Sequence, residues 1–139
     1  MSPYFTGRMK LAQENMGKIN YCTTDRFVKD FKKLSKIYES LEDDLTIVKR
    51  NAIELFHIHN INNQSCFPIP SFCTENMKIC KIKKFACRSM KGKGVKSGIR
   101  IIYAFIPKQE KVIFIEIYYK GNKANEDRER IKEFIKNNN

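Results

Sequence analysis

The sequence predicts an α+β fold in which an N-terminal helical hairpin packs on a small antiparallel sheet with a mixed edge, followed by a short C-terminal helix. Three observations indicate this fold. Apolar residues recur at helical spacing between residues 27 and 55, two long apolar runs lie between residues 99 and 119, and an amphipathic segment ends the chain. An order of helices, then strands, then one more helix is typical of helices that cover a single antiparallel sheet.

Two apolar faces predict the helical hairpin. A short strand at residues 19–23 leads into the first helix, which Thr24 or Asp25 would cap. The apolar face of this helix comprises Phe27, Phe31, Leu34 and Tyr38. The second helix begins at Ser40, which has capping-box spacing to Asp43. Its apolar face comprises Leu41, Leu45, Val48, Ala52 and Leu55. Both faces repeat at intervals of three and four residues, so we expect them to share one apolar seam.

The second half of the chain predicts the sheet. Residues 59–76 contain two prolines among Asn and Ser residues, and we expect a long loop there. A basic strand follows at residues 77–87. The run Ile99–Ile106 is apolar on both faces apart from Arg100, which predicts a central strand. The run Lys111–Tyr119 then returns as its antiparallel partner.

The two ends of the chain set the expected domain limits. We expect one domain over residues 19–139, preceded by an N-terminal tail at residues 1–18. The tail lacks the apolar core of a secretory signal, and no apolar run approaches the ~20 residues that span a bilayer. At the other end, Asn125 would cap a helix whose apolar stripe comprises Ile131, Phe134 and Ile135. These features predict a cytoplasmic protein.

Charge restricts the function classes. The chain has 27 Lys and Arg residues against 15 Asp and Glu residues, which gives a formal net charge of +12. Such a charge must be offset by packing or by an anionic partner, which would be nucleic acid, an anionic membrane surface or an acidic protein.

Cysteine and histidine predict no metal site. The five cysteines are an odd number and lack the spacing of zinc ligands, so we expect reduced thiols. His57 and His59 could bind a metal, but no nearby residue completes a site. We therefore predict neither a metal nor a cofactor.

A basic window distinguishes this chain from an ordinary soluble domain. Between residues 78 and 100 there are nine basic residues and no Asp or Glu: Lys78, Lys81, Lys83, Lys84, Arg88, Lys91, Lys93, Lys96 and Arg100. A lysine-protected edge strand would account for Lys81 and Lys83. It would not account for Arg100, because a guanidinium in an apolar strand carries a desolvation cost unless it is paired or functional. The glycines of KGKGVKSG let a polyanion approach the backbone, but the spacing is wrong for a nucleotide P-loop.

The partner strand would bring more cations to the same edge. If the two strands pair through PKQE, Tyr119 lies near Arg100, and Lys120 and Lys123 follow it. An aromatic ring beside lysines suits base stacking with phosphate contact. The alternative is that two tyrosines finish a half-buried strand. RNA or DNA is the polyanion that we expect at this edge.

The stretch KGKGVKSGIRIIYAFIPKQEKVIFIEIYYKGNKANEDRERI resembles the C-terminal half of RelE/ParE-superfamily toxins, particularly their RelE/HigB-like branch. Gly98 to Tyr103 resembles that family's Gly-Tyr-Arg strand, with Ile99 in place of the usual aromatic residue. Tyr118, Lys120 and Lys123 resemble its return strand. The resemblance covers residues 19–136. It implies the toxin of a type II toxin–antitoxin system, an mRNA interferase that cleaves mRNA on the translating ribosome, inhibits translation and acts in the bacterial stress response.

Each candidate residue has an expected role in that reaction. Cleavage by the RNA 2′-hydroxyl needs a base, an acid and a group that stabilises the charged phosphorane. We assign Arg100 to the developing charge, because a guanidinium offers bidentate donors to phosphate. Clustered cations would lower a lysine pKa toward neutrality, so proton transfer is expected from Lys93, Lys96, Lys120 or Lys123. Tyr119 completes the expected catalytic set. The expected RNA-binding residues are Lys81, Lys83, Lys84, Arg88, Lys91 and Tyr118, of which Arg88 and Lys91 would contact ribosomal RNA.

The resemblance also implies partners, and rival functions stay open. The expected partners are a cognate antitoxin, mRNA and the ribosome, with operator DNA reached only through the antitoxin and no membrane. One rival is a ParE-like DNA gyrase inhibitor that lacks nuclease activity. Another is a basic RNA-binding module without catalysis. The roles of base and acid stay open among the four lysines.

Overall fold

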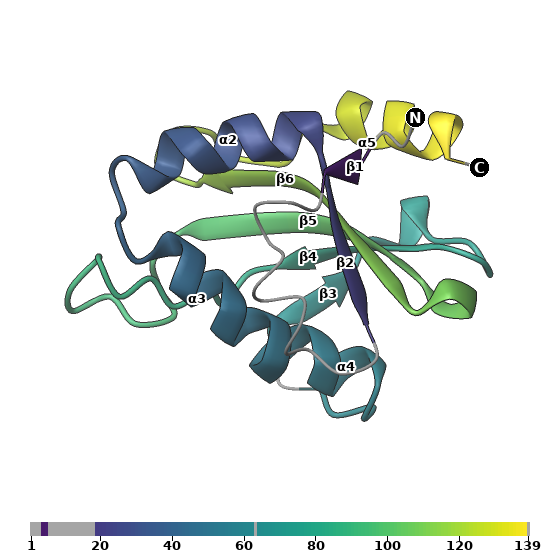
Figure 1. The fold of residues 1–139 in the computed structure, drawn as a ribbon, viewed down its shortest axis with the longest axis horizontal. Helices are drawn as coiled ribbons and strands as arrows, with labels where there is room; N and C mark the ends of the chain where they lie inside the picture. Colours follow the sequence, from purple (N-terminus) through teal and green to yellow (C-terminus); the bar gives the residue numbers. More distant parts are fainter. Residues whose placement is uncertain (1–3, 6–18, 63, 139) are drawn as a thin grey trace.

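A mixed sheet runs through the part of the chain that the computed structural model describes, residues 4–5, 19–62 and 64–138 (Figure 1). Its strand order is β1-β2-β6-β5-β4-β3. The strands are β1 (Tyr4–Phe5), β2 (Asn20–Thr24), β3 (Cys66–Pro68), β4 (Lys78–Ile82), β5 (Ile99–Ile106) and β6 (Lys111–Tyr119). β2 and β6 pair in parallel, whereas every other neighbouring pair is antiparallel. The predicted α+β class is therefore confirmed, and the sheet is mixed, with its parallel pair between β2 and β6.

The β5–β6 hairpin lies at the centre of the sheet, as predicted. Both strands have the predicted bounds, and they pair from Ile99 opposite Tyr119 to Ile106 opposite Lys111. A 3-10 turn, η4 (Pro107–Gln109), connects them, and Glu110 closes it with a φ of 48°. The register shifts by one residue near Ile102, which marks a β-bulge on β6. β5 and β6 are apolar on both faces because helices and loops cover the sheet on both sides.

Two helical segments contribute to the apolar cluster on the first face of the sheet. The helix α2 (Asp25–Ser35) begins where the Thr24 side chain accepts a hydrogen bond from the Phe27 N–H at 3.2 Å, which confirms one of the two predicted caps. The second segment comprises α3 (Leu41–Val48), the π-helix η2 (Lys49–Glu54) and α4 (Leu55–His57). The cluster on this face includes Phe27, Phe31, Leu34, Leu41, Leu45, Val48, Tyr103 and Phe114.

Two details of the second helical segment differ from the prediction. The Ser40 side chain makes no cap; its hydroxyl instead donates to the Asp44 carboxylate at 2.6 Å, so the capping box with Asp43 is wrong. The π turn inserts an extra residue into the helical repeat. As a result Ile53 is fully buried, while Leu55, which the regular repeat placed in the seam, is only half-buried.

The second face of the sheet is covered by α5 (Arg128–Asn137) and by the segment that precedes β4. Apolar side chains on this face form a separate cluster that includes Phe72, Met77, Ile79, Ile113, Ile131 and Phe134. α5 is capped by Asp127, whose carboxylate accepts the Arg130 N–H at 3.1 Å, so the predicted cap at Asn125 is wrong. In Figure 1, α2 and α5 run along the top of the sheet, with α3 and α4 below.

Residues 59–76 are not only a loop. They contain the edge strand β3 and the 3-10 turn η3 (Pro70–Phe72). The pattern missed β3 because it is three residues long and ends on Pro68. The basic strand predicted at residues 77–87 ends as β4 at Ile82, and beyond it only Phe85 makes an isolated bridge, to Lys96.

Three remaining findings concern the tail, the thiols and the membrane. Within the predicted tail, Tyr4–Phe5 pairs with β2, and residues 1–3 and 6–18 lie outside the described residues. All five cysteines are described, and each is a free thiol. Among the described helices, none is long and apolar enough to cross a bilayer.

Candidate nucleic-acid interface

One end of the second sheet face carries four cations and an aromatic ring. We call this surface the basic face and define it by Lys81, Lys83, Arg100, Lys123 and Tyr118. Side chains alternate between the faces of a strand. Ile99 and Ile101 belong to the cluster on the first face, which places Arg100 on the second. Tyr118, which is opposite Arg100 in the register, belongs to the second cluster.

Lysines from two distant segments approach the Tyr118 ring. The Lys81 ammonium, on β4, lies 6.0 Å from the ring centroid, and the Lys123 ammonium, after β6, lies 5.3 Å from it. Lys83 is one position beyond β4, and its ammonium lies 4.8 Å from the centroid of the Phe67 ring. Ammonium groups over aromatic faces are attracted by the ring quadrupole. This face therefore combines Arg100 and Lys123 from the hairpin and the segment after it with two lysines at the end of β4.

Two carboxylates that sequence reasoning missed are part of the basic face. Glu126 accepts from Lys81 at 2.7 Å, and Glu116, a buried residue of β6, forms an ion pair with Lys123. Glu116 also accepts the Asp127 N–H at 2.9 Å, which ties the start of α5 to the sheet. The signal for Glu116 was present in the sequence, since a lone carboxylate within an apolar strand needs a cation or donor partner.

These contacts decide the charge state of Lys81. Partial burial disfavours its ammonium, but the hydrogen bond to Glu126 and the charges nearby outweigh burial and raise the pKa of Lys81. The pKa of the Tyr118 hydroxyl is also raised, in this case by burial, although the charge of Lys81 and its hydrogen bond oppose the shift. Both groups are therefore protonated near neutral pH. Lys81 is suited to holding an anion and not to removing a proton.

Arg100 is oriented by backbone carbonyls. Its Nη1 donates to the Lys83 carbonyl at 2.8 Å and, more weakly, to the Ile99 carbonyl at 3.4 Å. The side chain is half-buried, and no carboxylate lies within ion-pair distance of it in the described part of the chain. A guanidinium has five N–H donors, so these two bonds leave donors for an oxyanion.

Tyr119 does not share a face with Arg100. Its ring packs against the first cluster and lies 6.2 Å from the Tyr38 ring. It is also flanked by Gly98 and Gly121, since a Cβ on either glycine would meet the ring at 3.1 Å or 2.3 Å respectively. Tyr118 and Tyr119 therefore have different surroundings, and only Tyr118 is close to the basic face.

The loop at residues 91–98, which we call the glycine loop, meets the end of β6, as the hairpin geometry predicted. The Lys120 N–H donates to the Gly98 carbonyl at 2.8 Å, which joins the end of the loop to the segment after β6. The side chains of Lys93, Lys96 and Lys120 are exposed. No carboxylate of the described residues lies within ion-pair distance of these three lysines. No ion pair among the described residues orients these three side chains, whereas Glu126 and Glu116 hold the side chains of Lys81 and Lys123.

The loop is held at both ends by buried groups. Asp44, which is buried, accepts from the Arg88 backbone N–H at 3.2 Å and from the Arg88 Nε at 3.1 Å. At the other end, the Ser97 hydroxyl donates to the Phe85 carbonyl. Arg88, expected to contact RNA, is thus engaged by Asp44 and also by the exposed Asp43 at 3.4 Å.

The remaining expected RNA-binding residues lie at the margin of the basic face. Lys84 is exposed and donates to the Gln64 side chain at 3.4 Å, and Lys91 is exposed in the loop. The structure therefore gathers Arg100, Lys81, Lys83, Lys123 and Tyr118 on one face. It places the loop lysines and Lys120 beside the end of the hairpin, where the Tyr119 ring lies between Gly98 and Gly121 on the first face and not on the basic face.

No group of three or more His, Cys, Asp and Glu residues is arranged to hold a metal ion within the described ranges. Comparison of the chain with models of known protein families, with curated proteins and with solved structures finds no match.

Proposed function

We propose that this protein is a RelE-like toxin of a type II toxin–antitoxin system that cleaves mRNA on the ribosome and is neutralised by a cognate antitoxin. The observation that carries the proposal is the basic face, where Arg100 lies opposite Tyr118 in the register and two lysines approach the same ring. Cations gathered at one end of a strand pair provide contacts for a phosphodiester backbone. The proposal includes a RelE-like packing of the two helical segments on the sheet.

In the proposed reaction, Arg100 stabilises the negative charge that develops on the phosphorane. Its Nη1 donates to the carbonyls of Lys83 and Ile99, which leaves Nε and Nη2 as donors to a phosphate oxygen. Lys81 and Lys123, held by Glu126 and Glu116, act as phosphate contacts. Proton transfer falls to Lys93, Lys96 or Lys120, whose ammonium groups have no carboxylate partner among the described residues. RNA binding would draw these lysines toward Arg100.

The positive charge of the chain supports the proposal of an acidic antitoxin. The chain carries a formal net charge of +12, and three exposed lysines at the hairpin end lack carboxylate partners in the described structure. An acidic segment laid over this end would complement the potential and speed association. Such a segment would also block access of RNA to the basic face.

Controlled expression in a bacterium tests this function against its rivals. The proposal predicts rapid arrest of translation with mRNA truncated inside coding regions, and rescue when an adjacent antitoxin gene is co-expressed. Intact mRNA with induction of the DNA-damage response would indicate a gyrase inhibitor. Normal growth with accumulated, folded protein would indicate a passive RNA-binding module. Either of these last two results would overturn the proposal.

A further inference from the structure

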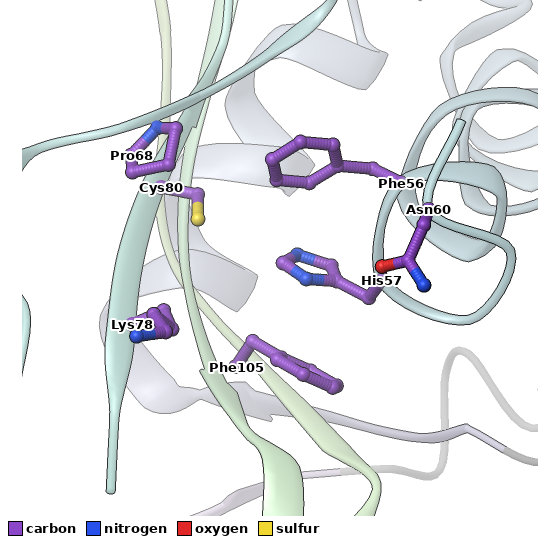
Figure 2. A pocket seen from close by; sticks show the side chains of 7 residues that line it. All are labelled: Phe56, His57, Asn60, Pro68, Lys78, Cys80 and Phe105. Carbon is purple, nitrogen blue, oxygen red and sulfur yellow. The ribbon is translucent and has the colours of Figure 1, made fainter. Parts of the chain in front are cut away.

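A pocket of about 270 Å³ opens on the first face of the sheet, at the end of β5 remote from Arg100 (Figure 2). Phe105, which lines the pocket, lies five positions after Arg100 in β5, about 17 Å away at 3.4 Å per residue. Arg100 is on the opposite face. The pocket is therefore separate from the basic face and plays no part in the reaction proposed above.

The pocket exists because the second helical segment ends early. α4 stops at His57, and the chain then turns away at Asn60, which has a φ of 56°. The turn leaves the ends of β4 and β5 incompletely covered. Figure 2 shows Phe56, His57 and Phe105 on one side of the space, with Cys80 and the other sheet residues opposite.

Aromatic rings form one wall. The His57 ring stacks on Phe105 with centroids 4.0 Å apart and an interplanar angle of 19°. Phe56 meets His57 edge-on at 4.8 Å. These contacts hold the three rings in fixed orientations, so an aromatic wall is present without a ligand. An aromatic molecule can pack against the ring faces and edges of such a wall.

A hydrogen-bonded network lies behind that wall. His57 Nε2 is 2.8 Å from the hydroxyl of the fully buried Tyr103, whose hydroxyl also interacts with the thiols of Cys66 and Cys80. Burial lowers the pKa of His57 to about 4, so its ring is neutral at pH 7. The wall therefore carries no charge and adds to the apolar character of the pocket.

Among the described residues that line this pocket, the only charged one is a cation. Lys78 is exposed at the start of β4, and no described carboxylate lies within ion-pair distance of it. The described lining contains no Asp or Glu. An anionic group at the mouth would meet Lys78 without repulsion from a neighbouring acid.

We propose that this pocket binds a small planar aromatic molecule that carries one anionic group, with its ring against His57 and Phe105 and its charge at Lys78. The volume of about 270 Å³ lies just below the range for ligand pockets, ~300–1,000 Å³, which restricts the ligand to one ring system. The anionic group is a carboxylate or a phosphate. The inference does not depend on the proposed nuclease function.

Histidine NMR tests the proposal directly, because the chain has two histidines and only His57 lines the pocket. Imidazole resonances of the full-length protein would be followed during titration with benzoate, phenyl phosphate and the neutral analogue benzamide. The substitution His59→Gln assigns the two sets of resonances, and the exposed His59 is the internal control. We expect a saturable shift at His57 with a Kd of about 1 mM or tighter for one of the anions, weaker binding of benzamide and no shift at His59.

Two lysine variants complete the test. Lys78→Gln is expected to weaken binding of the anion about 5-fold to 10-fold and to leave benzamide binding unchanged. Lys108→Gln, in η4, changes a lysine outside the lining and should bind like the parent. An unshifted His57 at saturating concentrations would overturn the proposal. So would equal binding of benzoate and benzamide, or equal affinities in the two lysine variants.

Discussion

Lys49 lies fully inside the protein, with its ammonium 4.6 Å from the centroid of the Tyr21 ring and 5.7 Å from that of Phe114. No hydrogen-bond acceptor reaches its Nζ in the described part of the chain. Burial lowers the pKa of Lys49 to about 8, although Glu42 and Glu54 oppose the shift. Because the usual value is 10.5, keeping this group charged at pH 7 costs about 3 kcal/mol.

Replacement of Lys49 by Met is therefore expected to stabilise the protein. The free energy of unfolding at pH 7 should rise by about 1–2 kcal/mol, since lost ring contacts offset part of the gain. The folded pKa lies below the unfolded value, so the unfolded state binds more protons between pH 8 and 10.5 and the parent gains stability as pH rises through that window. The advantage of Lys49→Met should accordingly shrink at pH 10. Urea unfolding at both pH values measures this, with the exposed Lys29→Met as control; destabilisation at pH 7 would contradict it.

Arg100 is the residue on which the proposed chemistry depends most. Arg100→Ala should lower the rate of RNA cleavage by about 10²-fold, because it removes an electrostatic donor to the developing charge. Arg100→Lys should recover only part of this, since an ammonium cannot donate in bidentate geometry. Lys108→Ala, at the other end of the hairpin, is the matched control and should keep full activity. Unchanged cleavage by a folded Arg100→Ala protein would exclude the assigned role.

At the scale of elements, the end of the hairpin is organised by the Tyr119 ring between two glycines. A Cβ on Gly121 would lie 2.3 Å from this ring, whereas a Cβ on Gly92 would meet no atom within 4 Å. The Gly92 backbone has a φ of 82°, so its substitution is strained for a different reason. Gly121 is therefore required because a side chain would collide with a ring, whereas Gly92 is required because of its backbone conformation.

Gly121→Ala should destabilise the protein by about 1–3 kcal/mol, because the Tyr119 ring must move out of its packed position. Thermal unfolding of the variant measures the loss. Combining Gly121→Ala with Tyr119→Ala should cost less than the sum of the single substitutions, since the steric conflict is then absent. Additive losses would show that the ring and the glycine do not interact in solution.

The glycine loop is the second element whose position depends on a buried group. Asp44→Asn removes the charge that holds the Arg88 backbone and side chain, and should cost about 2–4 kcal/mol of stability. Exchange of loop amides with deuterium should also accelerate. Asp43→Asn is the control, because Asp43 is exposed and its ion pair with Arg88 is worth at most ~1 kcal/mol. Equal effects of the two substitutions would contradict the anchoring role of Asp44.

Local patterns predicted the elements that bury the most apolar surface. The bounds of β5 and β6 follow from the two apolar runs, and Thr24 is one of the two predicted caps. Three of the four residues predicted on the apolar face of the first helix lie in α2, whereas Tyr38 lies beyond its end at Ser35. β3 could not be found, because three residues with a proline have no strand period. The π turn was equally invisible, since it changes the helical repeat without a distinct residue pattern. In the candidate site, the cations were evident, but the partners of Glu116 and Glu126 were not, because pairing with Lys123 and Lys81 depends on tertiary contacts.

At the scale of the whole molecule, the sheet separates two surfaces of different character. The basic face lies on the second face of the sheet, near the start of β5. The aromatic pocket lies on the first face, near the turn that joins β5 to β6. The parallel pairing of β2 with β6 brings residues 20–23 against residues 111–114 and so joins the N-terminal part of the described chain to the hairpin. The net charge of +12 then favours encounter with a polyanion over the whole surface.

The most direct measurement is primer extension on mRNA bound to purified, translating ribosomes after addition of the full-length protein. The account predicts new 5′ ends within the translated region, which are absent without ribosomes and reduced about 10²-fold with Arg100→Ala. Lys108→Ala should give the same ends as the parent protein. Uncut mRNA under conditions in which the folded protein binds ribosomes would contradict the account, and cutting that is equally efficient with Arg100→Ala would contradict the assignment of the basic face.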